Sequence, residues 1–200
     1  MDIGVLGGTF DPVHLGHLVV AEEVRDKLGL DQIIFVPAGQ PWLKADRPVS
    51  PAAHRLEMVS LSIADNPRFK ISTIDIDRPG PTYTVDTIAR LKGEIGAEAR
   101  IFFLMGGDAL VDLPRWKEPS CLVQMCRLVA FNRPGSVMPS LGWLESVVPG
   151  VSQSITFIEV PEVDISATQI RQRAAQGGSL QGLVPLAVER YILEQGLYRQ

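Results

Sequence analysis

The chain has 200 residues, 46% of them hydrophobic, which is enough apolar side chain for the core of one large domain. Its formal net charge of −4 disfavours a nucleic-acid-binding protein, because such proteins usually carry a clustered basic surface. No stretch approaches the roughly 20 apolar residues that span a bilayer, and the short apolar run at residues 3–6 has no basic leader. We therefore expect a cytoplasmic protein with no nucleic-acid or membrane partner.

The two cysteines, Cys121 and Cys126, do not indicate a disulfide framework. Five residues apart on a helix, they would point to different faces. We expect both to be buried thiols in a reducing compartment.

Short β-branched runs alternate with longer segments of helical period along the chain. This pattern is typical of an α/β fold, a doubly wound parallel sheet with helices on both faces, and it predicts a single domain over residues 1–200. The predicted strands are Ile3–Leu6, Gln32–Val36, Lys70–Ile76, Ile101–Met105, Leu128–Phe131 and Ile155–Val160. The predicted helices are Leu15–Leu28, Pro51–Ala64, Thr84–Ile95, Ser120–Met125 and Pro139–Val147, with two more at the C-terminal end.

Several predicted helices carry their own boundary signals. Ser50 is an N-cap candidate before a proline, and Thr84 can cap the helix that follows it. Ser166 and Gln169 fit a capping box, in which each side chain satisfies a backbone amide of the other residue. Gly196 stands where a left-handed cap would end the last helix.

The first predicted strand runs directly into Gly7, Gly8 and Thr9, at the edge where doubly wound sheets place ligands. Glycines let phosphate oxygens approach backbone amides closely, and the helix that follows directs the positive end of its dipole to the same space. An anion should bind here.

His14 and His17 are three residues apart at the start of that helix, so both side chains can reach one ligand. Alone, such a pair is more often a helix cap or surface feature, and a zinc pair would need a third ligand that the spacing does not offer. Beside the glycine turn, a phosphate contact is the better interpretation.

The segment GGTFDPVHLGH, residues 7–17, resembles the T/H-x-G-H signature of the nucleotidylyltransferase superfamily, in the form of bacterial nicotinate-nucleotide adenylyltransferases. A bare H-x-G-H also occurs in class I aminoacyl-tRNA synthetases, but the eleven-residue form is far more specific. The resemblance implies a Rossmann-like fold and transfer of the adenylyl group of ATP to nicotinate mononucleotide, with release of pyrophosphate. In this segment it assigns ATP contacts to Gly7, Gly8, Thr9, Phe10, His14 and His17, and a mononucleotide contact to Thr9.

A second motif opens a helix near the C-terminus, where Ser166, Thr168 and Arg171 can display hydroxyls and a cation at the sheet edge. It could also be a simple capped helix with a solvated arginine. The segment resembles the family's I-S-x-T-x-x-R motif, which implies a clamp on the β- and γ-phosphates of ATP. The C-terminal helices, about residues 166–200, would then complete the triphosphate site.

Three middle segments resemble the family's acceptor-binding parts. The loop ending at Lys44 is similar to P-x-x-x-P-P-H-K, except that Trp42 and Leu43 replace proline and histidine, and it implies that Lys44 reaches the transferring phosphate. Lys44 could equally be an exposed surface lysine. Residues 81–87 resemble P-S-Y-T-x-x-T, which implies that the nicotinate carboxylate meets the backbone beside Tyr83 and Thr84.

The remaining assignments also follow from the resemblance. Trp116 would stack on the pyridine ring, although an isolated tryptophan could equally be a core or rim aromatic. Thr87 and Arg133 would contact the mononucleotide, and Gly106 and Asp108 the adenosine. The third histidine, His54, lies on an amphipathic helix, and we expect it to be structural.

The implied chemistry is in-line attack by the acceptor phosphate on the α-phosphorus of ATP, with no side-chain nucleophile. His17 would stabilise the developing charge, with His14 alongside and Lys44 and Arg171 flanking. Magnesium would arrive with ATP and have few protein ligands of its own. A homo-oligomer is compatible with the sequence.

Four rival functions fit the sequence less well. Phosphopantetheine adenylyltransferases are usually shorter and have threonine where His14 stands, and the R-T-x-G-I-S-T-T ending of cytidylyltransferases is not matched. A class I synthetase fragment would need a K-M-S-K-S loop, which is missing. A non-catalytic nucleotide sensor is disfavoured because both phosphate motifs keep their charged and hydroxylic residues.

Overall fold

The computed structural model describes residues 1–41, 49–96, 98–132 and 138–199. Six strands form one parallel sheet in the order β4-β2-β1-β6-β7-β8, which confirms the predicted α/β class. These strands are β1 (Asp2–Gly8), β2 (Gln32–Pro37), β4 (Phe69–Ile71), β6 (Arg100–Gly106), β7 (Arg127–Phe131) and β8 (Ile155–Ile158). A separate short parallel ladder joins β3 (Gln40–Pro41) to β5 (Pro81–Thr82).

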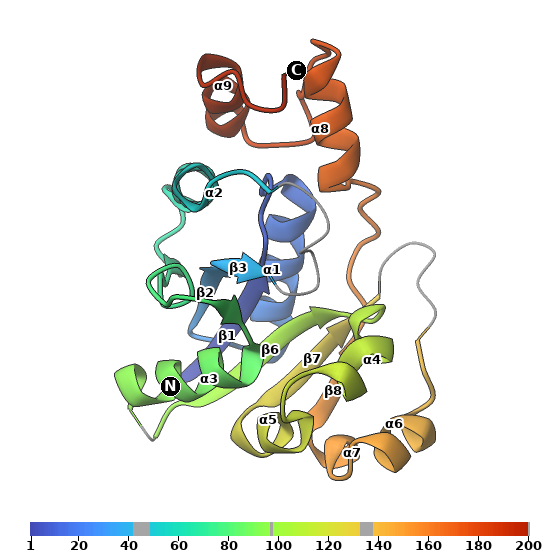
Figure 1. Ribbon diagram of the computed structural model, residues 1–200. Helices are drawn as coiled ribbons and strands as arrows, with labels where there is room; N and C mark the ends of the chain where they lie inside the picture. Colours follow the sequence, from blue (N-terminus) through green and yellow to red (C-terminus); the bar gives the residue numbers. More distant parts are fainter. Residues whose placement is uncertain (42–48, 97, 133–137, 200) are drawn as a thin grey trace.

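Helices connect the strands and cover both faces of the sheet (Figure 1). They are α1 (Leu15–Leu28), α2 (Ala52–Ile63), α3 (Thr84–Ile95), α4 (Ala109–Asp112), α5 (Pro119–Met125), α6 (Leu141–Val147), α7 (Val151–Ser154), α8 (Ala167–Ala175) and α9 (Leu186–Glu194). A 3₁₀ turn at Leu113–Arg115 follows α4. Among the described residues, no helix has the length and apolar character needed to cross a membrane.

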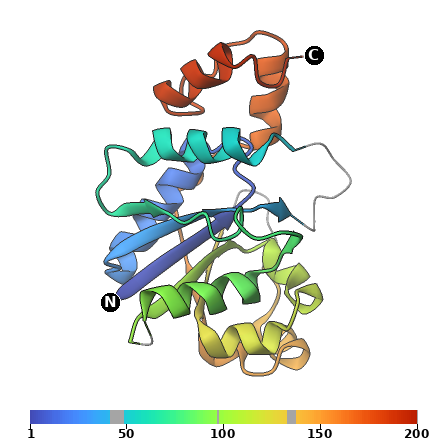
Figure 2. The ribbon, with the colours of Figure 1, turned by 60° about the vertical axis from the view of Figure 1, so that its left-hand side comes forward.

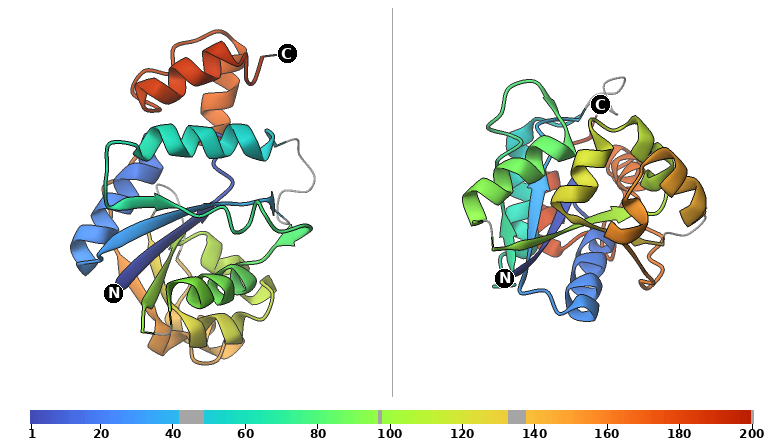
Figure 3. Two further views of the ribbon diagram at one scale, coloured as in Figure 1. Left: turned by 90° about the vertical axis from the view of Figure 1, so that its left-hand side faces the viewer. Right: turned by 90° about the horizontal axis from the view of Figure 1, so that it is seen from below.

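Alternating side chains of each strand feed two separate hydrophobic clusters, one on each face of the sheet. In β2, Ile33 and Phe35 pack with α1, α2, α8 and α9, whereas Ile34 and Val36 pack with α3, α5 and α6. The left view of Figure 3 shows this layering, with α2 (cyan) and the C-terminal helices (orange to red) on one side and α3 (green) on the other. The central strands are therefore buried on both faces, which explains their nearly continuous apolar sequences, whereas Lys70 in β4 and Phe157 in β8 are exposed at the sheet edges.

The last helix, α9, packs on α2, on the side of α2 away from the sheet (Figure 2). The ring nitrogen Nδ1 of His54 in α2 lies 2.9 Å from the hydroxyl of Tyr191 in α9. This contact ties α9 to α2, and it agrees with a structural role for His54.

The sheet has its topological switch point between β1 and β6. From β1 the chain first adds β2 and β4 on one side and then crosses to add β6, β7 and β8 on the other. The loops after β1 and β6 therefore leave in opposite directions and open a crevice at the carboxyl edge of the sheet. Both predicted glycine-containing loops, after residues 6 and 105, lie at this crevice.

Two predicted strands are too long. The strand predicted over Lys70–Ile76 ends at Ile71, because β4 is an edge strand paired only with the first half of β2 and the chain then turns. The turn closes with hydrogen bonds from the amides of Ile76 and Asp77 to the carbonyl of Thr73. Similarly, the last strand ends at Ile158, where its pairing with β7 ends.

The predicted boundary signals have mixed outcomes. The Ser166 hydroxyl accepts from the Gln169 amide at 3.2 Å and the Gln169 side chain accepts from the Ser166 amide at 3.1 Å, so the capping box is confirmed. Gly196 has a φ of 60°, as expected for the left-handed end of α9. The caps predicted at Ser50 and Thr84 are wrong, since Pro51 and Tyr83 take the N-cap positions.

The prediction that both cysteines are buried is half wrong. Cys126 is buried at the end of α5, whereas Cys121 is exposed on the same helix. The two thiols are free, as expected from their different directions on the helix.

Candidate active site

A cavity of about 710 Å³ opens at the carboxyl edge of the sheet and extends from the turn after β1 to the start of α8. Fourteen of the predicted contacts line it, although they come from segments far apart in the sequence. They are Gly7, Gly8, Thr9, Phe10, His14, His17, Thr84, Thr87, Gly106, Asp108, Trp116, Ser166, Thr168 and Arg171. The fold therefore brings both phosphate motifs and part of the predicted acceptor site to one space.

The turn after β1 is shaped by side chains that pack under it. Phe10 is buried with a φ of 50°, and its ring lies so close to Gly8 that a Cβ there would approach ring carbons to 2.9 Å. At Gly16, a Cβ would lie 3.1 Å from Nδ1 of His14. Glycine at these two positions keeps the backbone close to both the phenylalanine and histidine rings.

His14 and His17 act together at the start of α1. His14 is the N-cap residue, and its amide donates to Nδ1 of His17 at 3.2 Å. The two rings stack with their centroids 3.7 Å apart, and Phe10 meets the His17 ring edge-on at 5.0 Å. Because Nδ1 of His17 accepts a hydrogen bond, the neutral ring carries its proton on Nε2, which makes that nitrogen a hydrogen-bond donor.

The amides at the start of α1 are partly engaged within the chain. Leu15 donates to the carbonyl of Leu183 at 3.0 Å, and His17 donates to that of His14 at 2.9 Å. The helix dipole still favours an anion at this end. Fewer backbone amides are therefore open to an anion at this helix start than the sequence predicts, so the predicted anion site would depend more on imidazole and hydroxyl groups.

Asp11 joins the β1 turn to the C-terminal part of the chain. Its backbone carbonyl accepts from Nη1 of Arg171 at 2.8 Å, and its carboxylate accepts from the Tyr198 hydroxyl at 2.8 Å and from the Ser50 amide at 3.2 Å. Burial and the nearby Asp11 carboxylate raise the pKa of Tyr198, so this hydroxyl remains a donor. Nη2 of Arg171 lies 3.2 Å from the Thr168 hydroxyl, which aligns the two residues of the second motif.

Arg55 holds the turn after β1 and two neighbouring loops in place, and it is almost fully buried, with 1% of its surface exposed. Its guanidinium donates to the carbonyls of Thr9, Ala38, Gly39 and Ser50 at 2.8, 2.7, 3.2 and 2.9 Å. Burial lowers its pKa, against the attraction of Asp11. Four carbonyls from three segments are thus held by one side chain.

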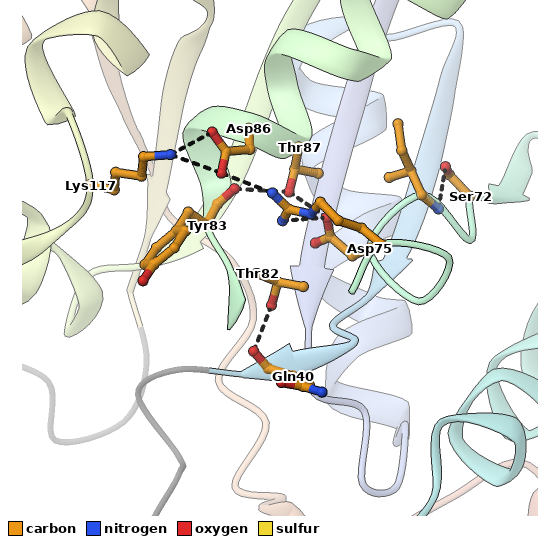
Figure 4. Close-up of polar contacts among 10 residues, drawn as sticks. Gln40, Ser72, Asp75, Thr82, Tyr83, Asp86, Thr87 and Lys117 are labelled. Atoms are coloured by element: carbon orange, nitrogen blue, oxygen red, sulfur yellow. Dashed lines mark hydrogen bonds and ion pairs between the residues drawn. The ribbon is translucent and has the colours of Figure 1, made fainter. Parts of the chain in front are cut away.

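The wall nearest α3 is formed by hydroxyls and one aromatic ring. Thr84 and Thr87 line the cavity from the first turn of α3, and Trp116 lines it with its ring edge-on to Phe103 at 6.0 Å. Tyr83 caps α3 but does not line the cavity. Its backbone carbonyl accepts from the Thr87 hydroxyl at 3.1 Å (Figure 4).

Two predicted site residues, Lys44 and Arg133, lie outside the described residues, as do Trp42 and Leu43. Asp75, Asp112 and Asn132 also line the cavity but are not among the predicted contacts, and neither are the buried Arg55 and the partly buried Tyr198. For Arg55 a signal was available, because it precedes Met58 and Val59 on the apolar face of α2. Tyr198 and Asp75 gave no comparable signal, since both follow turns whose paths depend on tertiary contacts.

The doubly wound parallel sheet, with a glycine turn and a histidine pair at its switch point, is typical of nucleotide-binding α/β proteins. Comparison with known proteins narrows this class. A family described as cytidylyltransferase-like matches residues 5–173. A protein of Dehalococcoides mccartyi strain CBDB1 named probable nicotinate-nucleotide adenylyltransferase is 48% identical over 195 residues, covering 98% of this chain and 96% of that protein.

Further relatives agree with this match. A Thermomicrobium roseum protein of the same name is 45% identical over 197 residues, covering 98% of this chain and 91% of its own. The structure of Plasmodium falciparum nicotinic acid mononucleotide adenylyltransferase complexed with NaAD superposes with a TM-score of 0.77 at 20% identity, covering 98% and 97% of the two chains. This chain therefore belongs to the cytidylyltransferase-like family and, within it, to the nicotinate-nucleotide adenylyltransferases.

Proposed function

We propose that the chain transfers the adenylyl group of ATP to nicotinate mononucleotide, forming nicotinate adenine dinucleotide and pyrophosphate in NAD biosynthesis. The observation that carries this proposal is that the histidine pair, the Ser166–Arg171 motif and the residues Thr84, Thr87 and Trp116 all line one cavity. The relatives named above carry the same activity in their names, and the Plasmodium structure holds NaAD.

In this proposal the chain works by positioning two anions and stabilising charge as the transfer proceeds. The Nε2 proton of His17 is directed to the α-phosphate, and His14 supports the ring through its stacked imidazole and amide. Ser166, Thr168 and Arg171 hold the β- and γ-phosphates, so that the C-terminal segment, about residues 166–200, completes the triphosphate site. Lys44 flanks the transferring phosphate.

The nucleosides occupy the two ends of the cavity. Gly106 and Asp108, which follow β6, take the adenosine. The start of α3 takes the nicotinate carboxylate, since free amides at a helix start are good carboxylate donors, and Trp116 stacks on the pyridine ring. Thr9, Thr87 and Arg133 contact the remainder of the acceptor.

Magnesium is part of the proposal. Among the described residues, no group of three or more histidine, cysteine, aspartate or glutamate side chains is arranged to hold a metal ion. The carboxylates and hydroxyls of the cavity wall, Asp108, Asp112, Ser166 and Thr168 included, are oxygen donors that suit a hydrated magnesium ion held mainly by phosphates. When bound, the ion would neutralise charge on the triphosphate.

A cytoplasmic location is proposed as well, because the substrate is ATP and both cysteines are free thiols. No nucleic acid or membrane is proposed as a partner, and a homo-oligomer remains compatible with the proposal.

The decisive experiment supplies ATP and magnesium together with nicotinate mononucleotide, its amide counterpart or phosphopantetheine, and follows pyrophosphate and the adenylylated product. We expect rapid product formation with nicotinate mononucleotide and slower formation with the amide. Preference for phosphopantetheine would replace the proposed acceptor, and absence of any product would favour a nucleotide sensor.

A further inference from the structure

The acceptor end of the cavity contains a carboxylate that the proposed reaction does not use. Asp75 follows β4, lines the cavity and is only 6% exposed. Thr84 and Thr87 line the same wall, where the acceptor carboxylate is proposed to bind. Two carboxylates in one partly enclosed space repel each other, so an anionic acceptor needs the charge of Asp75 to be offset.

Arg78 supplies this offset from behind the wall. Its Nη2 lies 3.3 Å from Oδ1 of Asp75, and its Nη1 lies 2.8 Å from Oδ2 of Asp86. The Arg78 side chain is 9% exposed and does not line the cavity. One guanidinium therefore pairs with two carboxylates from outside the cavity.

Lys117 completes the charge balance. Its ammonium lies 3.0 and 3.2 Å from the two oxygens of Asp86 and 5.3 Å from the centre of the Tyr83 ring. Figure 4 shows Asp86, Lys117, Thr87 and Asp75 converging from α3, the segment after Trp116 and the turn after β4. Lys117 thus shares Asp86 with Arg78, which leaves Arg78 as the cation in direct contact with Asp75, and Arg90 adds a weaker attraction.

The Asp75 carboxylate is held in place by the same cluster. The Thr87 hydroxyl donates to its Oδ1 at 2.7 Å and Nη2 of Arg78 lies 3.3 Å from the same oxygen, so the carboxylate is held at the cavity wall. Burial raises the pKa of Asp75, against the hydrogen bond of Thr87 and the attraction of Arg78. Removing Arg78 would leave a buried carboxylate without its nearest cation, at the place where the acceptor brings another.

We propose that Arg78 is a specificity-determining positioning residue, which lets the cavity accept the acid form of the acceptor by neutralising Asp75 beside the first turn of α3. The inference rests on the proposed function. The amide counterpart has no charge on this group, so its binding depends little on the charge of Asp75. Arg78 thus controls the ratio of acid to amide turnover rather than turnover as such.

The test compares kcat/KM for nicotinate mononucleotide and its amide in Arg78→Met, using the full chain with ATP and magnesium. We expect a loss of about tenfold or more with the acid and less than about threefold with the amide. Arg25→Met is the matched control, because the side chain of Arg25 is 10% exposed, also pairs with two carboxylates, Glu22 and Asp26, and does not line the cavity. Its acid-to-amide ratio should equal that of the wild type.

A second variant separates charge from structure. Adding Asp75→Asn to Arg78→Met removes the unbalanced anion and should return the ratio toward the wild-type value. If thermal unfolding shows that Arg78→Met is not folded, Asp75→Asn alone replaces it, and we expect its preference for the acid to rise because Arg78 then faces no partner there.

The outcomes are distinguishable from failure of the proposed function. A wild-type chain that adenylylates neither acceptor would overturn the function and this inference together. A wild-type chain that uses the acid, with an unchanged ratio in folded Arg78→Met or in Asp75→Asn, would overturn the inference alone and leave Arg78 a structural residue.

Discussion

The guanidinium of Arg171 donates a 2.8 Å hydrogen bond to the backbone carbonyl of Asp11, 160 positions away in the sequence. The contact joins the glycine turn after β1 to the first turns of α8. Both segments line the same cavity, so under the proposed function Arg171 would position the turn after β1 as well as offer its own charge to the phosphates.

Replacing Arg171 should therefore affect both motifs. We expect Arg171→Ala to lower kcat/KM for ATP by about 100-fold or more, because a charge-assisted phosphate contact and the tie to Asp11 are lost together. Arg171→Lys keeps the charge without the forked geometry and should lose about tenfold. Steady-state kinetics check this. Arg173→Ala, an exposed arginine on the same helix, is the control, and an equal loss in that variant would contradict the prediction.

The side chain of His17 has a structural role, as a helix cap, and a proposed chemical role, and substitutions can separate the two. His17→Gln can still accept from the amide of His14, as a capping box allows, but lacks the imidazole Nε2 donor. We expect both His17→Gln and His17→Ala to lower kcat by about 100-fold or more while ATP binding changes much less. Only the alanine variant should lose about 1 kcal/mol of stability. Turnover and urea unfolding measure the two parts, and near-normal turnover in either variant would remove His17 from the proposed role.

The Tyr198 hydroxyl should matter for turnover. Tyr198→Phe removes the 2.8 Å hydrogen bond to Asp11 and the contact of the hydroxyl with Ser50, so the turn after β1 loses one of its fixed contacts. We expect kcat to fall by about three- to tenfold, with stability reduced by about 1–2 kcal/mol. Tyr191 lies on α9, away from the cavity, and its hydroxyl makes a comparable hydrogen bond to His54 of α2. Tyr191→Phe should therefore leave kcat unchanged.

Tyr198 also predicts a dependence of stability on pH. Its folded-state pKa lies above the ordinary value of 10.0, so its contribution is fully present below pH 10 and is lost as the pH rises further. Chemical unfolding between pH 9 and 11 should show a shallower decline in Tyr198→Phe than in the wild type. Parallel declines would show that the hydroxyl contributes nothing to this titration.

The two thiols should differ in reactivity. Burial raises the pKa of Cys126 to about 12, so it remains a protonated thiol at pH 8, whereas Cys121 is exposed. Iodoacetamide should label one site in the folded chain and two after unfolding in urea, as counted by mass spectrometry. Cys121→Ser should abolish labelling of the folded chain, and labelling of Cys126 there would contradict the burial described above.

Arg55 should be the most damaging of these positions for stability. Arg55→Met leaves the carbonyls of Thr9, Ala38, Gly39 and Ser50 without their donor, and we expect a loss of about 3 kcal/mol in urea unfolding. The exposed Arg68→Met should change stability by less than about 0.5 kcal/mol. Similar values for the two variants would show that water replaces the guanidinium.

The sequence predicted the sheet well because its strands are buried on both faces and read as apolar runs. The helices Leu15–Leu28 and Thr84–Ile95 match their predicted bounds, since the second has a clear apolar period and each is followed directly by a glycine, Gly29 or Gly96. The short helices α4 and α7 were missed because four residues are too few to show a period. The end of β4 depends on where its neighbour stops, and local sequence does not contain that information.

The candidate site was predictable where residues form contiguous motifs. The histidine pair and the Ser166–Arg171 segment could be read from the chain, because each is one local turn at a helix start. Arg78 and Asp75 could not be predicted, because their proposed role depends on contacts in a cluster with Thr87, Asp86 and Lys117, which lie on other elements. The roles of the predicted contacts, those of Lys44 and Arg133 included, remain predictions.

The bond between Asp11 and Tyr198 has a consequence for synthesis of the chain. The two residues are 187 positions apart, so Asp11 is translated long before its partner. A ribosome that still encloses residue 198 would hold the Tyr198 hydroxyl away from the turn after β1. Full assembly of this turn is therefore expected only after Tyr198 has left the ribosome.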